Sequence, residues 1–149
     1  LNKVTESCGT VKCWKACRLN DIEVVSARYQ KHARNRSDRT CVTNSYRSAE
    51  SNATVKAYGT IQHIYTHKLF DIEKVIFDVE WKTVVRTDPK TGFVVIKDDP
   101  NNAFNTSCRV VFADQCLPQT VNFWPVDPWN TSNDEYFVIT GNATSYVSE

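Results

Sequence analysis

Residues 68–86, KLFDIEKVIFDVEWKTVVR, form the longest stretch of the chain in which apolar and polar residues alternate. One side of the alternation carries Val75, Phe77, Val79 and Trp81, and the other carries Lys74, Ile76, Asp78, Glu80 and Lys82. A β-strand with one buried side and one solvent-facing side has this period of two. Phe70 and Ile72 have the opposite parity, which predicts a β-bulge between Glu73 and Lys74. A long, kinked strand of this kind is typical of a strongly curved sheet, such as a small barrel.

The rest of the chain predicts further short strands at fairly even spacing, preceded by one helix. We expect strands at residues 22–29, 39–46, 54–65, 68–86, 93–97, 107–113, 120–124 and 135–140, and a helix at residues 11–19. Connections of hairpin length indicate an all-β fold: an eight-stranded antiparallel up-and-down barrel with a short N-terminal helix. A sandwich of seven to nine strands would give a similar pattern, and periodicity alone does not separate the two.

Length and composition indicate a single domain, residues 1–149, large enough for a real core. The net charge is +1, but residues 1–50 carry ten Lys and Arg against five Asp and Glu. The positive charge is concentrated in residues 28–39 (RYQKHARNRSDR), which we interpret as a solvated loop rather than a site for an anionic partner. We expect no nucleic-acid partner, and no membrane insertion because no apolar run approaches the roughly 20 residues of a span. No signal peptide is recognised, so we expect a mature form.

Cysteines and glycosylation sequons indicate the compartment. The six cysteines are Cys8, Cys13, Cys17, Cys41, Cys108 and Cys116, and the Asn-x-Ser/Thr sequons begin at Asn35, Asn52, Asn105, Asn130 and Asn142. Disulfides and N-glycans form in the same secretory compartment, so the pattern predicts a secreted, extracellular glycoprotein with three disulfides. The first three cysteines lack the Cys-x-x-Cys spacing of most zinc sites, and we expect no metal.

Nothing in the sequence indicates catalysis. The three histidines, His32, His63 and His67, have no Ser or Cys nucleophile in evident context, and six paired cysteines would leave no free thiol. The chain has four glycines in all and no Gly-rich phosphate loop. We therefore expect a binding protein rather than an enzyme.

Four short motifs, in order along the chain, resemble the tick salivary lipocalin family, whose members include histamine-binding proteins. These motifs are Trp14-Lys15, DRTCV at residues 38–42, FADQC at residues 112–116 and DEYF at residues 134–137. The resemblance implies a lipocalin-like barrel. The chain departs from the family in lacking its cysteine-bearing C-terminal helix and the Gly-x-Trp signature of mainstream lipocalins. Dense sequons and the short C-terminus are similar to the japanin group, which implies sterol binding and action on host dendritic cells.

The resemblance also implies roles for particular residues. Cys8, Cys13 and Cys17 would pair with Cys41, Cys108 and Cys116, in an order that is left open. The barrel would enclose a hydrophobic small molecule, such as cholesterol or another lipid, with no other cofactor. The candidate ligand-binding residues are Val55, Ile61, Phe77, Val79, Trp81, Val110, Phe112, Phe123, Tyr136 and Val138. The same residues would equally well fill a solid core, and parity does not say which face of a strand points inward.

Two other kinds of binding stay open. A biogenic amine such as histamine or serotonin needs buried acids, but the family's Cys-Asp-aliphatic motif reads Cys116-Leu117-Pro118 here, and its Glu-Leu-aromatic motif reads Glu135-Tyr136-Phe137. Asp78 and Glu80 would reach an amine only if the polar face of residues 68–86 were luminal.

A protein-binding module, directed at a host immune-cell protein, is the second alternative. Residues 124–130, WPVDPWN, place two tryptophans and two prolines in one connecting segment. Exposed, rigid aromatic residues often anchor interfaces, although these could equally cap one end of a barrel. Glycans would restrict any contact face to the surface they leave bare. We expect a monomer. A piece of a glycosylated viral or cell-surface ectodomain would share this composition, and it would predict a sandwich.

Overall fold

The computed structural model describes residues 10–19, 22–27, 40–116, 121–130 and 134–140. Antiparallel strands make up most of these residues, and the helices with stated bounds are single turns, so the expected all-β class is confirmed. No helix in this part of the chain is long and apolar enough to cross a membrane.

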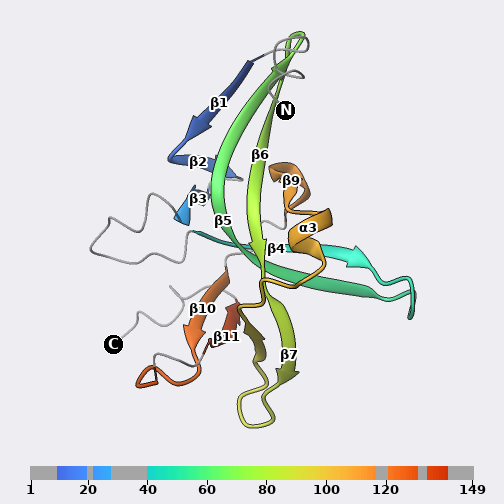
Figure 1. Ribbon diagram of the computed structural model, residues 1–149, viewed down its shortest axis with the longest axis vertical. Helices are drawn as coiled ribbons and strands as arrows, with labels where there is room; N and C mark the ends of the chain where they lie inside the picture. Colours follow the sequence, from blue (N-terminus) through green and yellow to red (C-terminus); the bar gives the residue numbers. More distant parts are fainter. Residues whose placement is uncertain (1–9, 20–21, 28–39, 117–120, 131–133, 141–149) are drawn as a thin grey trace.

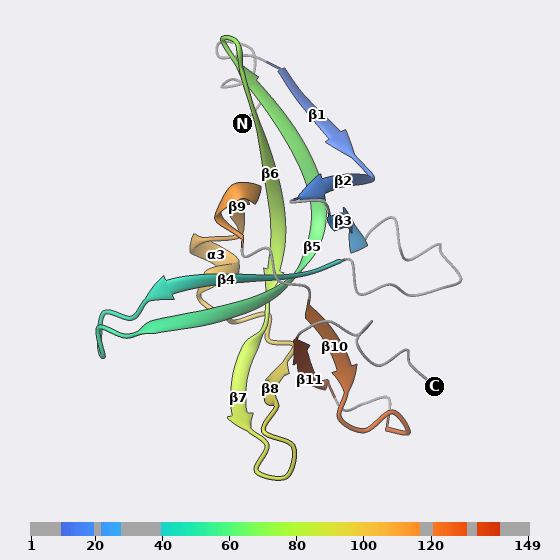
Figure 2. The same ribbon diagram turned by 180° about the vertical axis from the view of Figure 1, so that it is seen from behind.

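The strands form two larger sheets and one ribbon (Figures 1 and 2). The first sheet contains β1 (Thr10–Trp14), β4 (Cys41–Arg47), β5 (Thr54–Leu69), β6 (Ile72–Trp81) and β9 (Val110–Phe112). The second has the order β10 (Val121–Pro125), β11 (Glu135–Thr140), β8 (Val94–Lys97) and β7 (Thr83–Thr87). The ribbon pairs β2 (Ala16–Leu19) with β3 (Ile22–Val25). Two single helical turns, α3 (Phe104–Ser107) and η2 (Ala113–Gln115), flank β9.

Strand β5 organises the first sheet because it is paired along both edges. Its first half pairs with β4 and its second half pairs with β1 along the same edge, while β6 occupies the other edge from Gly59 onward. A strand that serves two partners in succession has to bend. Figure 1 shows β5 sweeping from the lateral β4–β5 hairpin into the long β5–β6 hairpin.

The bend in β5 contains a β-bulge. The register with β6 shifts between Ile61 and His63, so the buried positions of β5 change parity from Ile61 to Ile64. The bulge predicted between Glu73 and Lys74 is therefore wrong, because β6 pairs without a shift from Ile72 to Asp78.

The alternation in β6 has the expected orientation. Phe77, Val79 and Trp81 are buried, whereas Asp78 and Glu80 lie on the other face and are only partly buried. The phase slip that suggested a bulge has another cause. Phe70 lies in the two-residue turn between β5 and β6 with a positive φ of 56°, and it belongs to neither strand.

The helix expected at residues 11–19 is wrong. Strands β1 and β2 occupy these residues, with a break at Lys15. A nine-residue helix has little intrinsic stability, whereas β1 gains a ladder along β5 and a 2.8 Å hydrogen bond from Trp14 Nε1 to Thr66 Oγ1. Sheet pairing therefore outweighs the local helical pattern. Cys13 and Cys17 lie on different strands rather than one turn apart.

The remaining strand predictions are confirmed in part. Residues 135–140 coincide with β11, and β4, β5, β8 and β10 lie within two to four residues of the expected bounds. Of residues 22–29, the described part (22–27) contains the four-residue strand β3, and residues 107–113 contain the three-residue β9, which follows α3.

The strands do not close into a barrel among the described residues. Residues 68–86 divide at Lys82 into β6 and β7, which belong to different sheets. Strand β9 is hydrogen-bonded to β6, and the β10–β11 pair joins β8. The order therefore departs from a simple up-and-down succession, and eleven strands replace the eight expected in this part of the chain.

Each larger sheet contributes to its own hydrophobic cluster. The first cluster contains Val24, Val42, Ile61, Ile64, Phe77, Val79, Trp81, Ala113 and Cys116. The second contains Tyr58, Ile96, Val121 and Val138, with Cys41, Val94, Phe123 and Tyr136 packed against them. Strand β5 supplies residues to both clusters, since Tyr58 and Ile61 lie on opposite faces of the strand.

Gly59 is a test of how tightly β5 packs on β6. A Cβ atom at this position would collide with Val79 Cγ1 and lie 2.9 Å from Trp81 Cε3. We expect Gly59→Ala to lower the free energy of unfolding by about 2–3 kcal/mol through overpacking. Gly92→Ala is the control, because Gly92 has a φ of 77° but no neighbour within 4 Å, and it should lose only about 1 kcal/mol. Equal losses in chemical denaturation would contradict the packing argument.

Candidate functional site

The candidate ligand-binding residues divide among three environments. Ile61, Phe77, Val79 and Trp81 lie together in the first hydrophobic cluster. Val138, Phe123 and Tyr136 belong to the second cluster, on the other sheet. Val110 and Phe112, on the short edge strand β9, are exposed, and Val55 is half-buried near the outer end of β5. The structure thus brings four of the ten candidate residues together and separates the other six from them. The ligand-binding role of all ten stays a prediction.

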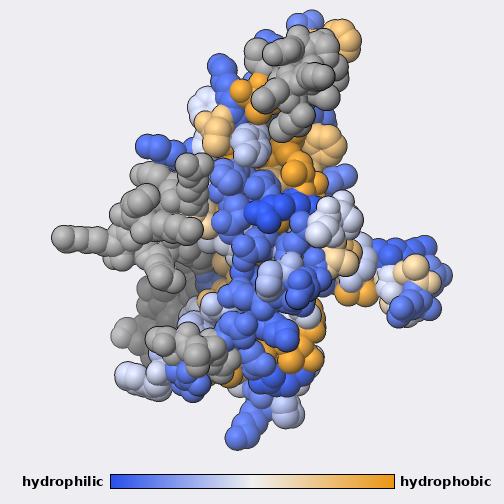
Figure 3. Space-filling view, in the orientation of Figure 1, coloured by the Kyte–Doolittle hydropathy of each residue, from blue (hydrophilic) through white to orange (hydrophobic). Residues whose placement is uncertain are grey.

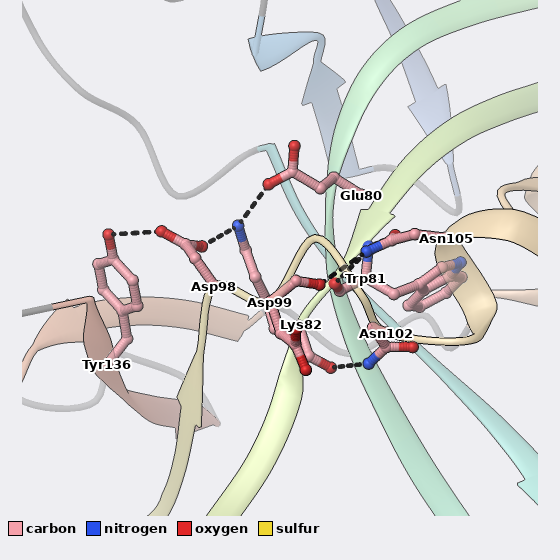
Figure 4. A network of polar contacts seen from close by, with 8 residues as sticks. All are labelled: Glu80, Trp81, Lys82, Asp98, Asp99, Asn102, Asn105 and Tyr136. Atoms are coloured by element: carbon pink, nitrogen blue, oxygen red, sulfur yellow. Dashed lines mark hydrogen bonds and ion pairs between the residues drawn. The ribbon is translucent and has the colours of Figure 1, made fainter.

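A network of polar side chains joins the two sheets where β6 ends and β7 begins (Figure 4). This junction network comprises Glu80, Trp81, Lys82, Asp98, Asp99, Asn102, Asn105 and Tyr136. Its members come from the β6–β7 break, from the turn after β8, from the start of α3 and from β11. The network therefore connects three parts of the chain that are far apart in the sequence, residues 80–82, residues 98–105 and Tyr136.

Lys82 holds one half of the junction network. Its side chain is only 9% exposed, and its Nζ atom lies 2.5 Å from Asp98 Oδ1 and 3.1 Å from Glu80 Oε1. The Tyr136 hydroxyl donates to Asp98 Oδ2 over 3.4 Å. The backbone N–H of Lys82 donates to Tyr58 O on β5 at 2.9 Å. Both the main chain and the ammonium of this residue are therefore fixed.

The charge state of Lys82 fits a structural role. Burial lowers the pKa of Lys82, but the hydrogen bonds and negative charges of Asp98 and Glu80 raise it further, so the pKa lies above its ordinary value. A lysine that stays protonated at neutral pH is neither a nucleophile nor a general base. Burial and the charge of Asp98 also raise the pKa of Tyr136. The protonated Lys82 and Tyr136 side chains thus keep the hydrogen bonds to Asp98 that join the two sheets.

The other half of the junction network fastens α3 to β6. The Asn105 side chain bonds to the backbone N–H and C=O of Trp81, and Asn102 Nδ2 donates to Lys82 O at 3.1 Å. Thr83 Oγ1 donates to Asp99 Oδ2 at 2.9 Å. Side-chain amides thus replace a neighbouring strand at the point where β6 changes sheet, which satisfies backbone groups that the break would leave unpaired.

A second polar cluster lies on the outer face of the β5–β6 pair. Asp78 Oδ2 lies 2.8 Å from His63 Nδ1, and Arg109 Nε donates to Asp78 Oδ1 at 2.6 Å. Asp78 is therefore committed to two partners on the face opposite Phe77. Glu80, the other acid considered for an amine, is committed to Lys82. Neither carboxylate faces the first hydrophobic cluster.

The cysteines do not form disulfides with one another within the described residues. Cys13 and Cys108 are exposed, whereas Cys17 and Cys116 pack in or against the first hydrophobic cluster. Burial raises the pKa of Cys17, and burial together with the charge of Asp114 raises the pKa of Cys116 to about 11. Cys8 lies outside the described residues, and the three disulfides stay a prediction. In the described part of the chain no group of three or more His, Cys, Asp or Glu side chains is placed to hold a metal ion.

The sequons lie in contrasting places. Asn52 and Asn130 are exposed, Asn105 is half-buried in the junction network, and Asn35 and Asn142 lie outside the described residues. The basic segment at residues 28–39, with His32, and the Leu117-Pro118 pair also fall outside the described residues.

The aromatic segment, residues 124–130, places both of its tryptophans on the surface. Trp124 lies opposite Phe137 in the β10–β11 pair and is 59% exposed, and Trp129 is 92% exposed. A β-turn presents Trp129: Asp127 Oδ1 accepts its N–H at 3.1 Å, and Asp127 O accepts the N–H of Asn130 at 3.3 Å. Pro128 at the second position of this turn restricts the backbone further. The tryptophans therefore do not cap a barrel. The backbone around Trp129 is held by this turn in the absence of a partner.

Sequence reasoning identified the aromatic segment but missed the junction network. The sequence signal is faint: a lysine at the end of an alternating strand, and an Asp- and Asn-rich segment at residues 98–102, whose composition by itself indicates only a turn. No family model, curated protein or solved structure matches the chain. The resemblance to tick salivary lipocalins therefore stays a prediction.

Lys82→Met tests the junction network. The substitution keeps the apolar stem and leaves Asp98 and Glu80 without their counter-charge. Breaking a buried pair costs about 3–5 kcal/mol, and the partial exposure of both acids reduces our expectation to about 2 kcal/mol. Chemical denaturation at pH 7 measures the loss. Lys74→Met is the control, because the Lys74–Asp114 pair is exposed and should contribute less than about 0.5 kcal/mol.

The raised pKa of Lys82 also predicts an alkaline effect. The folded protein retains the Lys82 proton at a pH where the unfolded chain has begun to lose it, so the Lys82 contribution is complete below the unfolded pKa, about 10.4. It disappears as the pH rises through the higher folded-state pKa. The stability difference between wild type and Lys82→Met should therefore shrink above pH 10. A difference that stays constant up to pH 12 would contradict this assignment.

Proposed function

We propose that this protein is a secreted, extracellular binding protein that contacts a protein partner through the aromatic segment. The observation that supports this most directly is the 92% exposure of Trp129 on a turn ordered by Asp127 and Pro128. The proposed partner class is a host immune-cell protein, as the lipocalin resemblance implies, and the binding role itself includes no catalysis.

An exposed tryptophan can contribute much of the binding free energy of a protein interface. A tryptophan side chain carries a large apolar surface with few rotatable bonds, so burying it against a partner gains much and orders little. Within this fold Trp129 gains almost nothing, because nearly all of its surface stays in water. Trp124 and Trp129 lie in one short segment, and their combined surface suits the centre of an interface, where tryptophan is enriched.

The surroundings of the aromatic segment favour a protein over a nucleic acid. Asp127 lies within it, and Asp134 and Glu135 follow at the start of β11. Acidic groups at this end repel phosphates, whereas they would form the polar rim of a protein interface. Arg86 on β7 already pairs with Glu135 at 3.0 Å, so we assign the polar rim to the carboxylates of Asp127 and Asp134.

Enclosure of a sterol or another lipid stays a separate prediction. Four of the candidate ligand-binding residues share one buried cluster, which would have to form the wall of a cavity. Mass spectrometry of small molecules extracted from protein secreted by eukaryotic cells tests this. A stoichiometric sterol or fatty acid would support it, and an empty extract would contradict it.

Trp129→Ala tests the protein-binding proposal. The variant should keep the unfolding temperature of the wild type, because the side chain has almost no contacts to lose, and should bind its partner at least about 30-fold more weakly. Binding is measured first on dendritic cells and other leukocytes by flow cytometry, and then on an array of purified receptor ectodomains by surface plasmon resonance.

Phe70→Asn is the matched control. Phe70 is 87% exposed at the end of the β5–β6 hairpin, which projects away from the aromatic segment (Figure 1). This variant should bind like the wild type. Equal binding by wild type and Trp129→Ala would reject the aromatic segment as the contact. Asn130→Asp, which removes the neighbouring sequon, shows whether a glycan there shields Trp129.

A further inference from the structure

The described sequons differ in what their side-chain amides do in the folded protein. Asn52 lies at the end of the β4–β5 hairpin and is exposed, with a positive φ of 55°. No hydrogen bond of its side-chain amide is among the described contacts that hold this turn, which are backbone bonds between Ser48 and Ala53 and between Asn52 N and Ser48 O, both 2.9 Å. A substituent on the Asn52 amide would therefore extend into solvent and leave these contacts intact.

The Asn105 amide is fully used by its neighbours. Its Oδ1 accepts the backbone N–H of Trp81 at 2.6 Å, and its Nδ2 donates to Trp81 O at 3.0 Å and to Asp99 O at 3.2 Å. The two Nδ2 hydrogens therefore both have acceptors. Asn105 pairs with Trp81 as a residue of a neighbouring strand would, in the middle of the junction network (Figure 4).

N-glycosylation uses the same nitrogen. The transfer forms a bond between Nδ2 and the anomeric carbon of an activated oligosaccharide, breaks the bond from that carbon to its pyrophosphate leaving group, and releases one Nδ2 proton. A glycosylated Asn105 would keep one N–H for two acceptors. It would also have to place a bulky, hydrated sugar between α3 and β6, where the side chain is half-buried. Because the transfer precedes folding, a chain modified at Asn105 could not rebuild this junction.

We propose that the folded, secreted protein carries an N-glycan at Asn52 and none at Asn105, whose amide instead clamps α3 to β6. The glycan part of this inference rests on the proposed secretion, whereas the clamp does not. The lateral β4–β5 hairpin is thus the glycan-bearing arm, and the junction between the sheets stays bare.

Site occupancy is the first experiment. The full chain is secreted from eukaryotic cells, the folded monomer is isolated, and each sequon is read by peptide mass spectrometry after enzymatic glycan removal in heavy-oxygen water. We expect the heavy-oxygen mark at Asn52 and unmodified Asn105. A stoichiometric mark at Asn105, or an unmarked Asn52, would overturn the proposal.

A crossed pair of substitutions separates glycan from clamp. Asn52→Asp should lose one glycan mass and keep the unfolding temperature, since aspartate also tolerates a positive φ. Asn105→Asp should lose no glycan mass but unfold about 5 °C lower, because it removes two donated hydrogen bonds. Ser107→Ala abolishes the Asn105 sequon but keeps the Asn105 amide. Its glycan mass should equal that of the wild type, so the two proteins should differ only by the mass of the substituted side chain. A glycan lost in Ser107→Ala, or an unchanged unfolding temperature in Asn105→Asp, would contradict the proposal.

These results are independent of the partner contact. Trp129→Ala can fail to affect binding while Asn52 and Asn105 behave as expected, and the reverse can also occur. The stability of Asn105→Asp is measured equally well on protein without glycans, so the clamp is tested even if secretion is disproved.

Discussion

The pairing of Lys82 with Asp98 and Glu80 is the interaction on which the arrangement of the two sheets depends. The chain leaves the first sheet at Trp81 and enters the second at Thr83, so Lys82 is the single residue between them. A buried ammonium stays in such a place only when its charge is compensated. Asp98 follows β8 directly, and thus the ion pair fixes the end of one sheet against the end of the other.

The same break explains why amide side chains gather at the junction. When β6 stops, the backbone of Trp81 and Lys82 needs partners that a regular strand would have supplied. Asn102 and Asn105 provide them from the chain around α3. The Trp81 indole then reaches in the same direction and donates to Cys108 O at 2.8 Å. A short helical turn with little stability of its own is therefore held by these polar contacts together with Phe104, which packs against the first hydrophobic cluster and the Tyr46 ring. No residue of α3 is fully buried.

The sequence predicted most accurately what depends on local alternation. That Phe77, Val79 and Trp81 share one face of the strand follows from a period of two and needs no knowledge of neighbours. The helix prediction for residues 11–19 was wrong because β1 pairs with the edge of β5, which lies about fifty positions further along the chain, and β2 pairs with β3. The barrel prediction was not met for a related reason. The pattern across residues 68–86 is continuous and cannot show that the chain passes from one sheet to the other at Lys82, since that depends on where Asp98 lies. The aromatic segment could be identified from the sequence because its turn depends on Asp127, Pro128 and Trp129, which are consecutive residues.

The polar side chains of the junction network are hydrogen-bonded to one another or to the backbone, whereas several large apolar side chains elsewhere in the described residues are exposed. In the view of Figure 3 hydrophilic residues cover the middle, and hydrophobic residues gather above it and beside β7, where Val84 and Val85 are exposed. Phe70 shows the same tendency at the end of the β5–β6 hairpin. A bulky residue with a φ of 56° is strained by about 1–2 kcal/mol, and its exposed ring recovers none of that within the fold. Glycine or asparagine would fit this turn better, so folding alone does not explain the phenylalanine. Phe70 and Trp129 thus share one property: each is an exposed aromatic residue on a turn, and its ring adds little packing to this chain.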